Sequence, residues 1–413
     1  MLEQKRPLDE VLDGNPDRDT LTPRDRAFAR MLVATTLRRL GQVDRVIDGS
    51  LDKPLPRRAG PVRELLRLGV CQLLFLGTPP HAAVDTTVEL IAARGGEAGF
   101  KGLINAILRR VDRERAAWLE QAAAPSLNTP VWLWESWVAA YGVERADEIA
   151  AAHLREPPLD LTPKADAAAW RERLGAALLP TGSLRLPLDG PVESLAGFAE
   201  GAWWVQDAAA ALPVRLLGDV RGKRVIDLCA APGGKTAQLA AAGAEVIAVD
   251  RSAPRLERLH RNLTRLGLNA TIVVADATLW QPDRPADSVL VDAPCSATGT
   301  IRRHPDVPWL KRPEDVAKLA ALQAPLLQGA LTMVKPGGLI VFCTCSLQPE
   351  EGPAHIDALL RRDASVERLP IQPVEVGGLD SLIDANGDLR TLPCHLSEQG
   401  GIDGFFAARL RRR

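Results

Sequence analysis

Residues 224–236, RVIDLCAAPGGKT, decide the fold, because a short β-branched run leads into the glycine pair Gly233-Gly234. Such a run favours a buried strand, and glycines let backbone approach a ligand where a helix begins. The ending GKT resembles a phosphate loop, but that motif requires a glycine where this chain has Cys229. The segment therefore predicts the first strand and ligand-binding loop of an α/β domain without a phosphate loop.

The sequence after this segment alternates between strand and helix patterns. Alternation of this kind predicts a parallel, doubly wound sheet that binds its ligand at the carboxyl ends of the strands. The strands are expected at 245–250, 271–274, 288–291 and 339–343, and the helices at 236–242, 253–266 and 314–334.

Three acids, Asp250, Asp276 and Asp292, follow successive predicted strands. One alternative is that each caps the turn or helix after it, the commonest reason for Asp at such a place. An acid after the second strand also suits the hydroxyls of a ribose. Three acids in register with a glycine-rich loop favour a nucleoside-containing cofactor.

Two cysteines are expected at the same sheet edge, Cys295 in DAPCSATG (292–299) and Cys345 in FCTCS (342–346). A thiolate that adds to C6 of cytosine makes C5 nucleophilic, whereas methylation of an amino group needs no thiol. A helix expected to start near Pro349 would favour the Cys345 thiolate. The alternative, a small buried apolar group, is expected for Cys229 and Cys343.

The composition excludes several classes of protein. With 46% hydrophobic and 25% charged residues and no long apolar run, the chain is expected to be globular and cytoplasmic, without a membrane span. Its charged N-terminus is unlike a secretory signal. The six cysteines have no paired C-x-x-C spacing, so neither a zinc site nor a disulfide framework is expected.

The N-terminal third predicts an all-α bundle. Helices are expected from Thr22 to a stop at Gly41, over 61–76, from His81 and over 103–111. Residues 121–130 are expected to be a linker, and the mixed pattern after Pro157 a small α+β region. The first 116 residues carry 20 Lys and Arg against 16 Asp and Glu, although the whole chain has a net charge of −1.

In combination, these motifs resemble those of the NOL/NOP/Sun family of RNA cytosine-C5 methyltransferases. The similar segments are WVQD (204–207), DLCAAPGGKT (227–236), AVD (248–250), ADA (275–277), VDAPCSATGTIRRHPDVPW (291–309), CTCSLQPEE (343–351) and DGFFA (403–407). PPHAAVDTTVELI (79–91) and FKGLINAILRRV (100–111) resemble the NusB-like RNA-binding bundle of one bacterial branch, which acts on small-subunit (16S) ribosomal RNA.

The resemblance implies a NusB-like RNA-binding domain over 1–120, a small α+β subdomain over 126–198 and a Rossmann-like class I methyltransferase domain over 199–413. It implies that Cys345 is the nucleophile and that Cys295 helps to resolve the covalent adduct and release product. The residues alone leave open which cysteine attacks. S-adenosyl-L-methionine would be bound by Cys229, Ala230, Ala231, Pro232, Gly233, Gly234, Lys235, Asp250, Asp276 and Asp292.

The partner implied is small-subunit ribosomal RNA. The side chains expected to face it are Lys101, Arg109, Arg110, Arg302, Arg303 and His304. Without the resemblance, these side chains fit a solvated charged surface equally well. The alternatives are the same chemistry on tRNA or another RNA, and a non-catalytic RNA-binding or assembly factor. A monomer is expected, because no long heptad seam is present.

Overall fold

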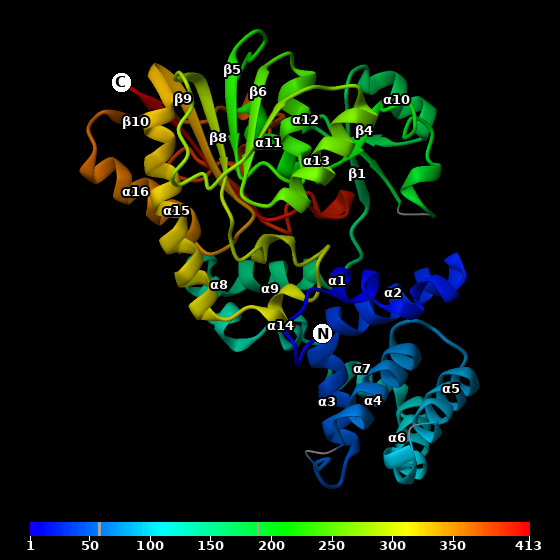
Figure 1. The fold of residues 1–413 in the computed structure, drawn as a ribbon. Coiled ribbons are helices and arrows are strands. Elements are labelled where there is room, and N and C mark those ends of the chain that lie inside the picture. Colours follow the sequence, from blue (N-terminus) through cyan, green and yellow to red (C-terminus); the bar gives the residue numbers. More distant parts are fainter. Residues whose placement is uncertain (57–58, 94, 188–189) are drawn as a thin grey trace. The chain divides into compact units, whose positions relative to one another are not determined.

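The computed structural model describes residues 1–56, 59–93, 95–187 and 190–413, which form two compact units (Figure 1). Unit 1 comprises Met1–Leu154 together with Arg303–Leu310, and unit 2 comprises Arg155–Arg302 together with Lys311–Arg413. Within the described residues, no helix combines the length and the apolar content needed to cross a membrane.

Unit 1 is built of amphipathic helices. α2 (Pro23–Arg38) begins as the sequence predicts, with Pro23 in its first turn and the Thr22 hydroxyl accepting a hydrogen bond from the Asp25 amide at 3.2 Å. Apolar residues at three- and four-residue spacing face the core. The remaining helices are α1 (Leu8–Asp13), α3 (Leu40–Ser50), α4 (Gly60–Leu74), α5 (Pro80–Ala92), α6 (Lys101–Arg113), α7 (Arg115–Gln121), α8 (Val131–Tyr141), α9 (Val143–His153) and α14 (Val307–Leu310).

Gly41 is not a helix stop, contrary to expectation. α2 ends at Arg38, and Gly41 is the second residue of α3. A Cβ on Gly41 would lie 1.7 Å from the carbonyl oxygen of Leu127, so glycine is required for close packing. Leu127 belongs to the expected linker, which instead forms a 3-10 helix (Pro125–Asn128). This segment is tied to α3, because the Asn128 side chain accepts a hydrogen bond from the Gln42 amide at 3.1 Å.

The segment 303–310 packs with the N-terminal helices. The Asp306 carboxylate accepts a hydrogen bond from the Leu8 amide at 2.9 Å, and the Trp309 indole donates one to the Leu37 carbonyl at 3.0 Å. This segment follows the loop of Cys295 in the chain, so unit 1 holds the next part of that motif.

Unit 2 contains the doubly wound sheet predicted by the sequence. The strand order is β10-β12-β9-β8-β5-β6-β7, with β11 paired to β12. The strands β7, β6, β5, β8 and β9 run parallel, and β12 is antiparallel to β9. Their bounds are β5 (Arg224–Leu228), β6 (Glu245–Asp250), β7 (Thr271–Val274), β8 (Ala286–Asp292), β9 (Val334–Thr344), β10 (Val366–Arg368), β11 (Leu389–Thr391) and β12 (Phe405–Arg412).

Helices cover both faces of this sheet (Figure 1), and alternate residues of each strand supply the two cores. Ile226 packs in the core formed with α15, for example, while its neighbour Val225 packs in the core formed with α11. The helices are α11 (Ala208–Arg215), α12 (Gly234–Ala241), α13 (Ala253–Leu266), α15 (Pro313–Met333) and α16 (Pro353–Arg362).

The expected middle subdomain does not form one compact unit. Its helices α8 and α9 belong to unit 1, whereas the chain from Arg155 onward belongs to unit 2. There it forms an antiparallel sheet of order β2-β3-β1-β4, with α10 beside it. The bounds are β1 (Leu159–Pro163), α10 (Ala167–Leu174), β2 (Ala177–Leu178), β3 (Leu184–Leu186) and β4 (Trp203–Val205).

Candidate active site

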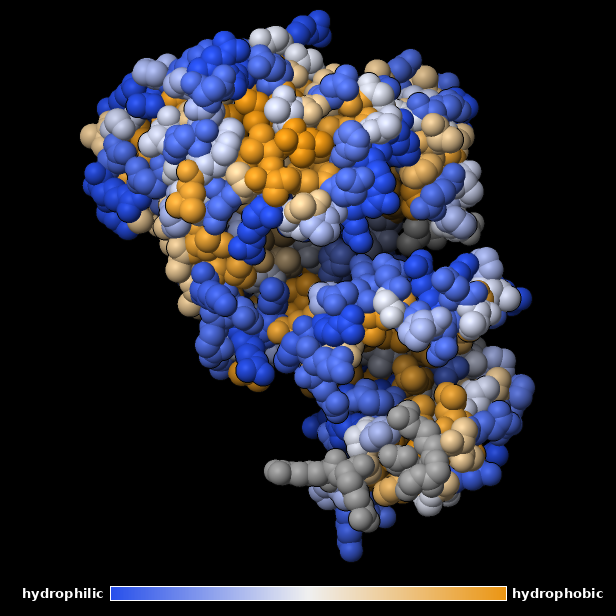
Figure 2. Space-filling view, in the orientation of Figure 1, coloured by the Kyte–Doolittle hydropathy of each residue, from blue (hydrophilic) through white to orange (hydrophobic). Residues whose placement is uncertain are grey.

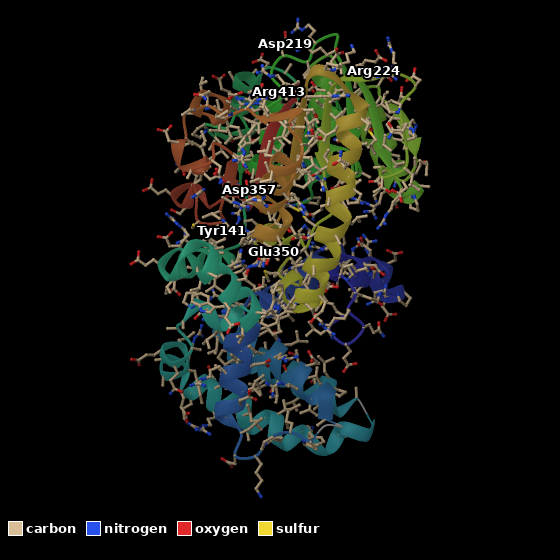
Figure 3. All side chains as sticks on the ribbon, turned by 90° about the vertical axis from the view of Figure 1, so that its left-hand side faces the viewer. Tyr141, Asp219, Arg224, Glu350, Asp357 and Arg413 are labelled. Atoms are coloured by element: carbon tan, nitrogen blue, oxygen red, sulfur yellow. The ribbon has the colours of Figure 1, made fainter. Side chains whose placement is uncertain are left out.

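The site lies at the carboxyl ends of β5, β6, β8 and β9. Residues from all four strand ends converge there, as parallel strands require. Figure 3 shows Glu350, just after β9, far from Asp219 and Arg224, which mark the amino end of β5. The candidate site and the amino end of β5 therefore lie at opposite ends of the sheet.

The loop after β5 has the backbone that its sequence predicts. Gly233 has a φ of +104°, and a Cβ there would lie 2.7 Å from Leu259 of α13. α12 begins immediately after it, so its free amide groups open toward the loop. Cys229 also has a positive φ, and burial raises the pKa of its thiol to about 12. Cys229 is therefore a protonated thiol, in agreement with a non-nucleophilic role.

The three strand-end acids have different surroundings. Asp250 is buried and accepts hydrogen bonds from the amides of Ala231 and Ser252, at 3.2 and 2.9 Å. Asp276 is exposed and accepts from Thr278. Both thus cap the turns that follow them, which was the alternative explanation. Asp292 makes no such cap.

A nucleoside-containing cofactor fits this donor set. Each Asp250 oxygen accepts one amide and keeps a second lone pair for a hydroxyl. Asp227, at the end of β5, accepts a hydrogen bond from the Thr236 hydroxyl at 2.6 Å through one oxygen, and its other oxygen is buried without a partner among the described residues. Burial raises the pKa of Asp227 to about 7. The loop therefore offers unused acceptors beside a close-approach glycine.

Cys295 and Cys345 lie side by side. Their sulfur atoms are 3.4 Å apart, within hydrogen-bonding distance for a thiol and a thiolate, although the residues are 50 positions apart in sequence. Both are partly accessible. The hydrogen bond to Cys345, followed by burial, raises the pKa of Cys295 well above its usual value. Either sulfur can donate the hydrogen bond between them.

Cys343 is separate from this pair. It is fully buried, and burial raises the pKa of its thiol, which lies 3.5 Å from an oxygen of Asp292. This agrees with the expectation of a core cysteine. All six cysteines of the chain are free thiols.

Lys235 faces the cysteines as well as the cofactor loop. Its ammonium donates a hydrogen bond to Asp292 at 2.8 Å and lies 4.8 Å from the centre of the Phe405 ring. Burial alone would lower the pKa of Lys235, but the charges of Asp292 and of the cysteines, including Cys345, raise it overall. Lys235 therefore remains a cation beside Asp292.

A buried carboxylate, Glu351, joins the two cysteine loops and was not singled out by the sequence analysis. Its side chain accepts hydrogen bonds from the residues that follow the two cysteines, Ser296 and Ser346. The one sequence feature that pointed to a shared hydrogen-bond partner is that a serine follows each of the two cysteines. The expected helix begins only at Pro353, after a 3-10 turn (Pro349–Glu351) that brings Glu351 to this position.

Arg302 does not agree with the expectation that it faces RNA. It is 1% exposed and lies 3.3 and 3.6 Å from the carboxylates of Asp207 and Asp403. These buried contacts explain why the motif has an arginine here. Arg303 is exposed, and His304 is partly buried in unit 1, where burial lowers its pKa.

The basic residues of α6 also differ from one another. Lys101 and Arg109 are exposed. Arg110 forms an ion pair with Glu114 at 3.1 Å, and its guanidinium lies 5.8 Å from the Trp118 ring centre. Lys101 and Arg109 are therefore better placed than Arg110 to contact a partner. Figure 2 shows that a mostly hydrophilic surface also covers α2.

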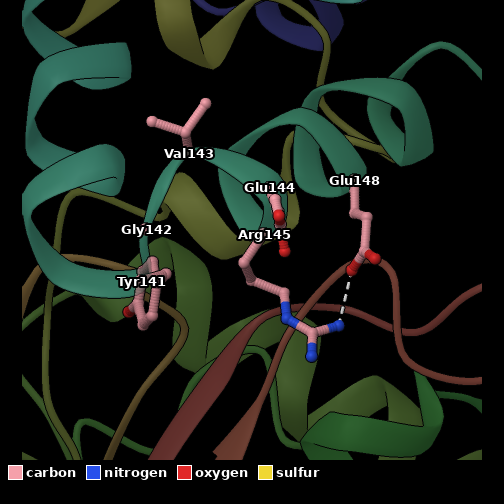
Figure 4. A pocket seen from close by; sticks show the side chains of 6 residues that line it. All are labelled: Tyr141, Gly142, Val143, Glu144, Arg145 and Glu148. Carbon is pink, nitrogen blue, oxygen red and sulfur yellow. Dashed lines mark hydrogen bonds and ion pairs between the residues drawn. The ribbon is translucent and has the colours of Figure 1, made fainter.

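One surface pocket lies at the turn between α8 and α9 (Figure 4). Its lining includes the ion pair between Arg145 and Glu148 and contains none of the residues predicted from the sequence. Within the described part of the chain, no group of three or more His, Cys, Asp or Glu side chains is arranged to hold a metal ion.

Two family models match the chain. Residues 214–411 match the model described as 16S rRNA methyltransferase RsmB/F, and residues 1–113 match the NusB family. The first match covers all of the strand-end residues described above, and the second covers helices α1 to α6.

Curated relatives match along most of the chain. Ribosomal RNA small subunit methyltransferase B of Salmonella arizonae is 38% identical, over 90% of this chain and 91% of the relative. The protein of the same name from Escherichia coli (strain SMS-3-5) is 36% identical, over 89% of each chain.

Solved structures support the fold. A methyltransferase homolog protein from Pyrococcus horikoshii is 27% identical, with a TM-score of 0.55, and is matched over 68% of this chain and 94% of its own. NSun6 from Pyrococcus horikoshii is 20% identical, with a TM-score of 0.57, over 68% of this chain and 98% of its own.

Proposed function

Since the chain belongs to the RsmB/F family of 16S rRNA methyltransferases, we propose that it methylates C5 of one cytidine in small-subunit ribosomal RNA through a covalent cysteine adduct. The observation that carries this proposal is the cysteine pair, with sulfur atoms 3.4 Å apart at the ligand edge of the sheet. Methylation of an exocyclic nitrogen needs neither thiol.

In the proposed first step, the Cys345 thiolate adds to C6 of the cytosine. A bond forms between Sγ and C6, and the electron pair of the C5–C6 double bond makes C5 nucleophilic. The hydrogen bond from Cys295 and the cation of Lys235 support the thiolate before attack. S-adenosyl-L-methionine, when bound, supplies the electrophilic methyl group that C5 receives.

The second step removes the C5 proton and releases Cys345. The hydrogen bond to Cys345 is the main cause of the raised pKa of Cys295. Once the Cys345 sulfur is bonded to carbon, Cys295 is proposed to give its proton to solvent. The resulting thiolate is proposed to accept the C5 proton, after which the C6–S bond breaks and the Cys345 thiolate leaves.

The cofactor is proposed to lie along the loop 229–235, with Asp250 and Asp276 toward its ribose. The close backbone at Gly233, the free lone pairs of Asp250 and the unpaired oxygen of Asp227 support this placement. Asp292 is proposed to lie where cofactor and cytosine meet, because its carboxylate bonds with Lys235 rather than capping a turn.

The proposed RNA contacts are Lys101 and Arg109 on α6 and Arg303 after the catalytic loop. All three are exposed, and cations of this kind bind phosphates irrespective of base sequence. The protein is proposed to act as a monomer, a state that light scattering measures directly. The same chemistry on tRNA is the second candidate, because the cysteine pair does not itself distinguish between RNAs.

The experiment is transfer of labelled methyl groups to small-subunit RNA from cells that lack the enzyme. The expected product is 5-methylcytidine, absent with Cys345→Ala, and a protein–RNA adduct is expected to accumulate with Cys295→Ala. Full activity of Cys345→Ala would refute the proposed nucleophile. Methylation of tRNA but not ribosomal RNA would keep the chemistry and replace the substrate.

A further inference from the structure

A single buried hydrogen-bond network holds the residues on either side of both cysteines. Its centre is Glu351, which is fully buried and lies at the end of the turn after β9. One carboxylate oxygen accepts the Ser296 amide at 2.8 Å, and the other accepts the hydroxyls of Ser296 and of Ser346, the latter at 2.5 Å. The residues directly after Cys295 and Cys345 thus share one carboxylate.

The residues directly before the cysteines join the same network. The Thr344 hydroxyl donates to the backbone carbonyl of Glu351 at 2.9 Å. The Gln323 amide, on α15, donates to the Pro294 carbonyl at 2.9 Å and to Glu351 at 3.3 Å. Each cysteine is therefore held on both sides by groups that bond to Glu351 or to a partner of Glu351.

The donors of Ser296, Ser346 and Gln323 point toward the carboxylate. Thr298 accepts the Leu347 amide through its hydroxyl oxygen and lies 3.3 Å from the Ser346 hydroxyl, which in turn accepts the Gln348 amide. This leaves the Ser346 proton for Glu351. Burial raises the pKa of Glu351, and the hydrogen bonds from Ser296 and Ser346 oppose that rise. An amide at this position would offer one acceptor oxygen where the carboxylate offers two.

We propose that Glu351 is a positioning residue, whose carboxylate sets the distance between the two thiols so that both reach one pyrimidine ring. The attacking sulfur must lie near C6 while the other thiol faces C5, and these atoms are neighbours in the ring. Because the hydroxyls and carboxylate are buried, their bonds resist exchange with water. The network thus fixes the geometry of the two loops, which the partly accessible cysteine side chains do not fix themselves.

This inference rests on the proposed function, so the wild-type protein is tested first for 5-methylcytidine formation. Glu351→Gln keeps the shape of the side chain and replaces one acceptor oxygen with a donor. It is expected to lower kcat by about 100-fold, as for a misplacement of about 1 Å, while the Kd for S-adenosylmethionine changes less than about twofold. Formation of the RNA adduct in the Cys295→Ala background is expected to slow by a similar factor.

Glu350→Gln is the matched control, because Glu350 is the exposed neighbour of Glu351 (Figure 3). It is expected to have wild-type kcat and Tm. Ser346→Ala is the second variant, which removes the hydroxyl that donates to Glu351 and accepts the Gln348 amide, without introducing a donor. Its kcat is expected to fall on the order of tenfold at unchanged cofactor Kd, with a small fall in Tm from the lost buried bonds.

The outcomes separate the two proposals. If the wild-type protein forms no 5-methylcytidine, the proposed function fails. If it does, and Glu351→Gln or Ser346→Ala has wild-type kcat, the positioning role fails alone. If Glu351→Gln does not fold, Ser346→Ala decides, and a fall in kcat that only parallels a fall in Tm and cofactor affinity also overturns the positioning role.

Discussion

Lys235 and Asp292 form an ion pair, with Nζ and Oδ2 2.8 Å apart, that connects the cofactor loop with the loop of Cys295. The Lys235 side chain is 9% exposed and that of Asp292 is 33% exposed, so the pair is only partly screened by water. The cation also acts on Cys345. In the proposed function, this pair connects the loop assigned to the methyl donor with the proposed nucleophile, Cys345.

Replacing Lys235 with methionine is expected to lower methyl transfer by about 100-fold, because the thiolate and Asp292 lose their common cation. Steady-state kinetics with labelled cofactor measure this. Lys335→Met is the matched control, since Lys335 forms a comparable 2.7 Å pair with Asp287 but is 51% exposed. A surface pair contributes little, so wild-type activity is expected there. Equal activity of both variants would contradict the role of Lys235.

Asp227 is expected to make stability depend on pH. Its folded-state pKa of about 7 lies above the ordinary value of 3.8, because burial penalises the charge. The contribution of Asp227 to the free energy of unfolding is therefore complete below about pH 4 and is lost as the pH rises toward 7. Asp227→Asn lacks this loss, so its Tm relative to wild type is expected to be higher at pH 8 than at pH 5, without cofactor.

The exposed Asp219, which lies at the other end of the sheet (Figure 3), provides the control. Asp219→Asn is expected to shift Tm equally at pH 5 and pH 8. The same pH-independent result for Asp227→Asn would show that the carboxyl is ionised in the folded protein at both values.

Three elements of the parallel part were predicted to the residue, whereas β8 and β9 are longer than the expected 288–291 and 339–343. β6 (Glu245–Asp250), α13 (Ala253–Leu266) and β7 (Thr271–Val274) have the expected bounds. Their signals are local: continuous apolar runs for the strands, buried leucines at helical spacing in α13, and a left-handed Gly267 that ends it. The convergence of Cys295 and Cys345 was also predictable, because both follow neighbouring parallel strands.

The parts that were not predicted depend on contacts between distant segments. Gly41 is a packing glycine against Leu127, and the sequence shows only a residue that often ends helices. The charged run around Arg302 predicts a solvated side chain, because its partner Asp403 lies 101 positions later in the chain. The sequence around Glu351 predicts the start of a helix. Its hydrogen bonds with Ser296 depend on the packing of the loop after β8 against the turn after β9.

The buried position of Arg302 predicts a stability effect rather than an RNA-binding effect. Arg302→Ala leaves Asp207 and Asp403 buried without their shared cation. A loss of about 3 to 5 kcal/mol in the free energy of unfolding is expected, measured by chemical denaturation. Arg303→Ala, at an exposed position, is expected to lower the free energy of unfolding less than Arg302→Ala and to weaken RNA binding. Wild-type stability of Arg302→Ala would contradict this prediction.

A pair of glycines tests the packing of unit 1. Gly41→Ala is expected to lower the free energy of unfolding by at least about 2 kcal/mol, because the Leu127 carbonyl cannot move without displacing the 3-10 helix around it. Gly102→Ala, on α6 with open space around it, is expected to raise it by about 0.5 kcal/mol. Circular dichroism during denaturation measures both. A neutral Gly41→Ala would show that the contact is loose.

The proximity of Cys295 and Cys345 predicts a specific oxidation product. Their sulfur atoms are 3.4 Å apart and need to approach to about 2.05 Å for a disulfide. Diamide, which accepts the two hydrogens, is expected to link them and abolish methyl transfer, and dithiothreitol is expected to restore it. Peptide mapping identifies the link, with fully buried Cys71 as the internal control that remains a free thiol. A link from Cys345 to Cys343 instead would contradict the arrangement of the loops, because it would place the buried thiol, and not Cys295, beside the nucleophile.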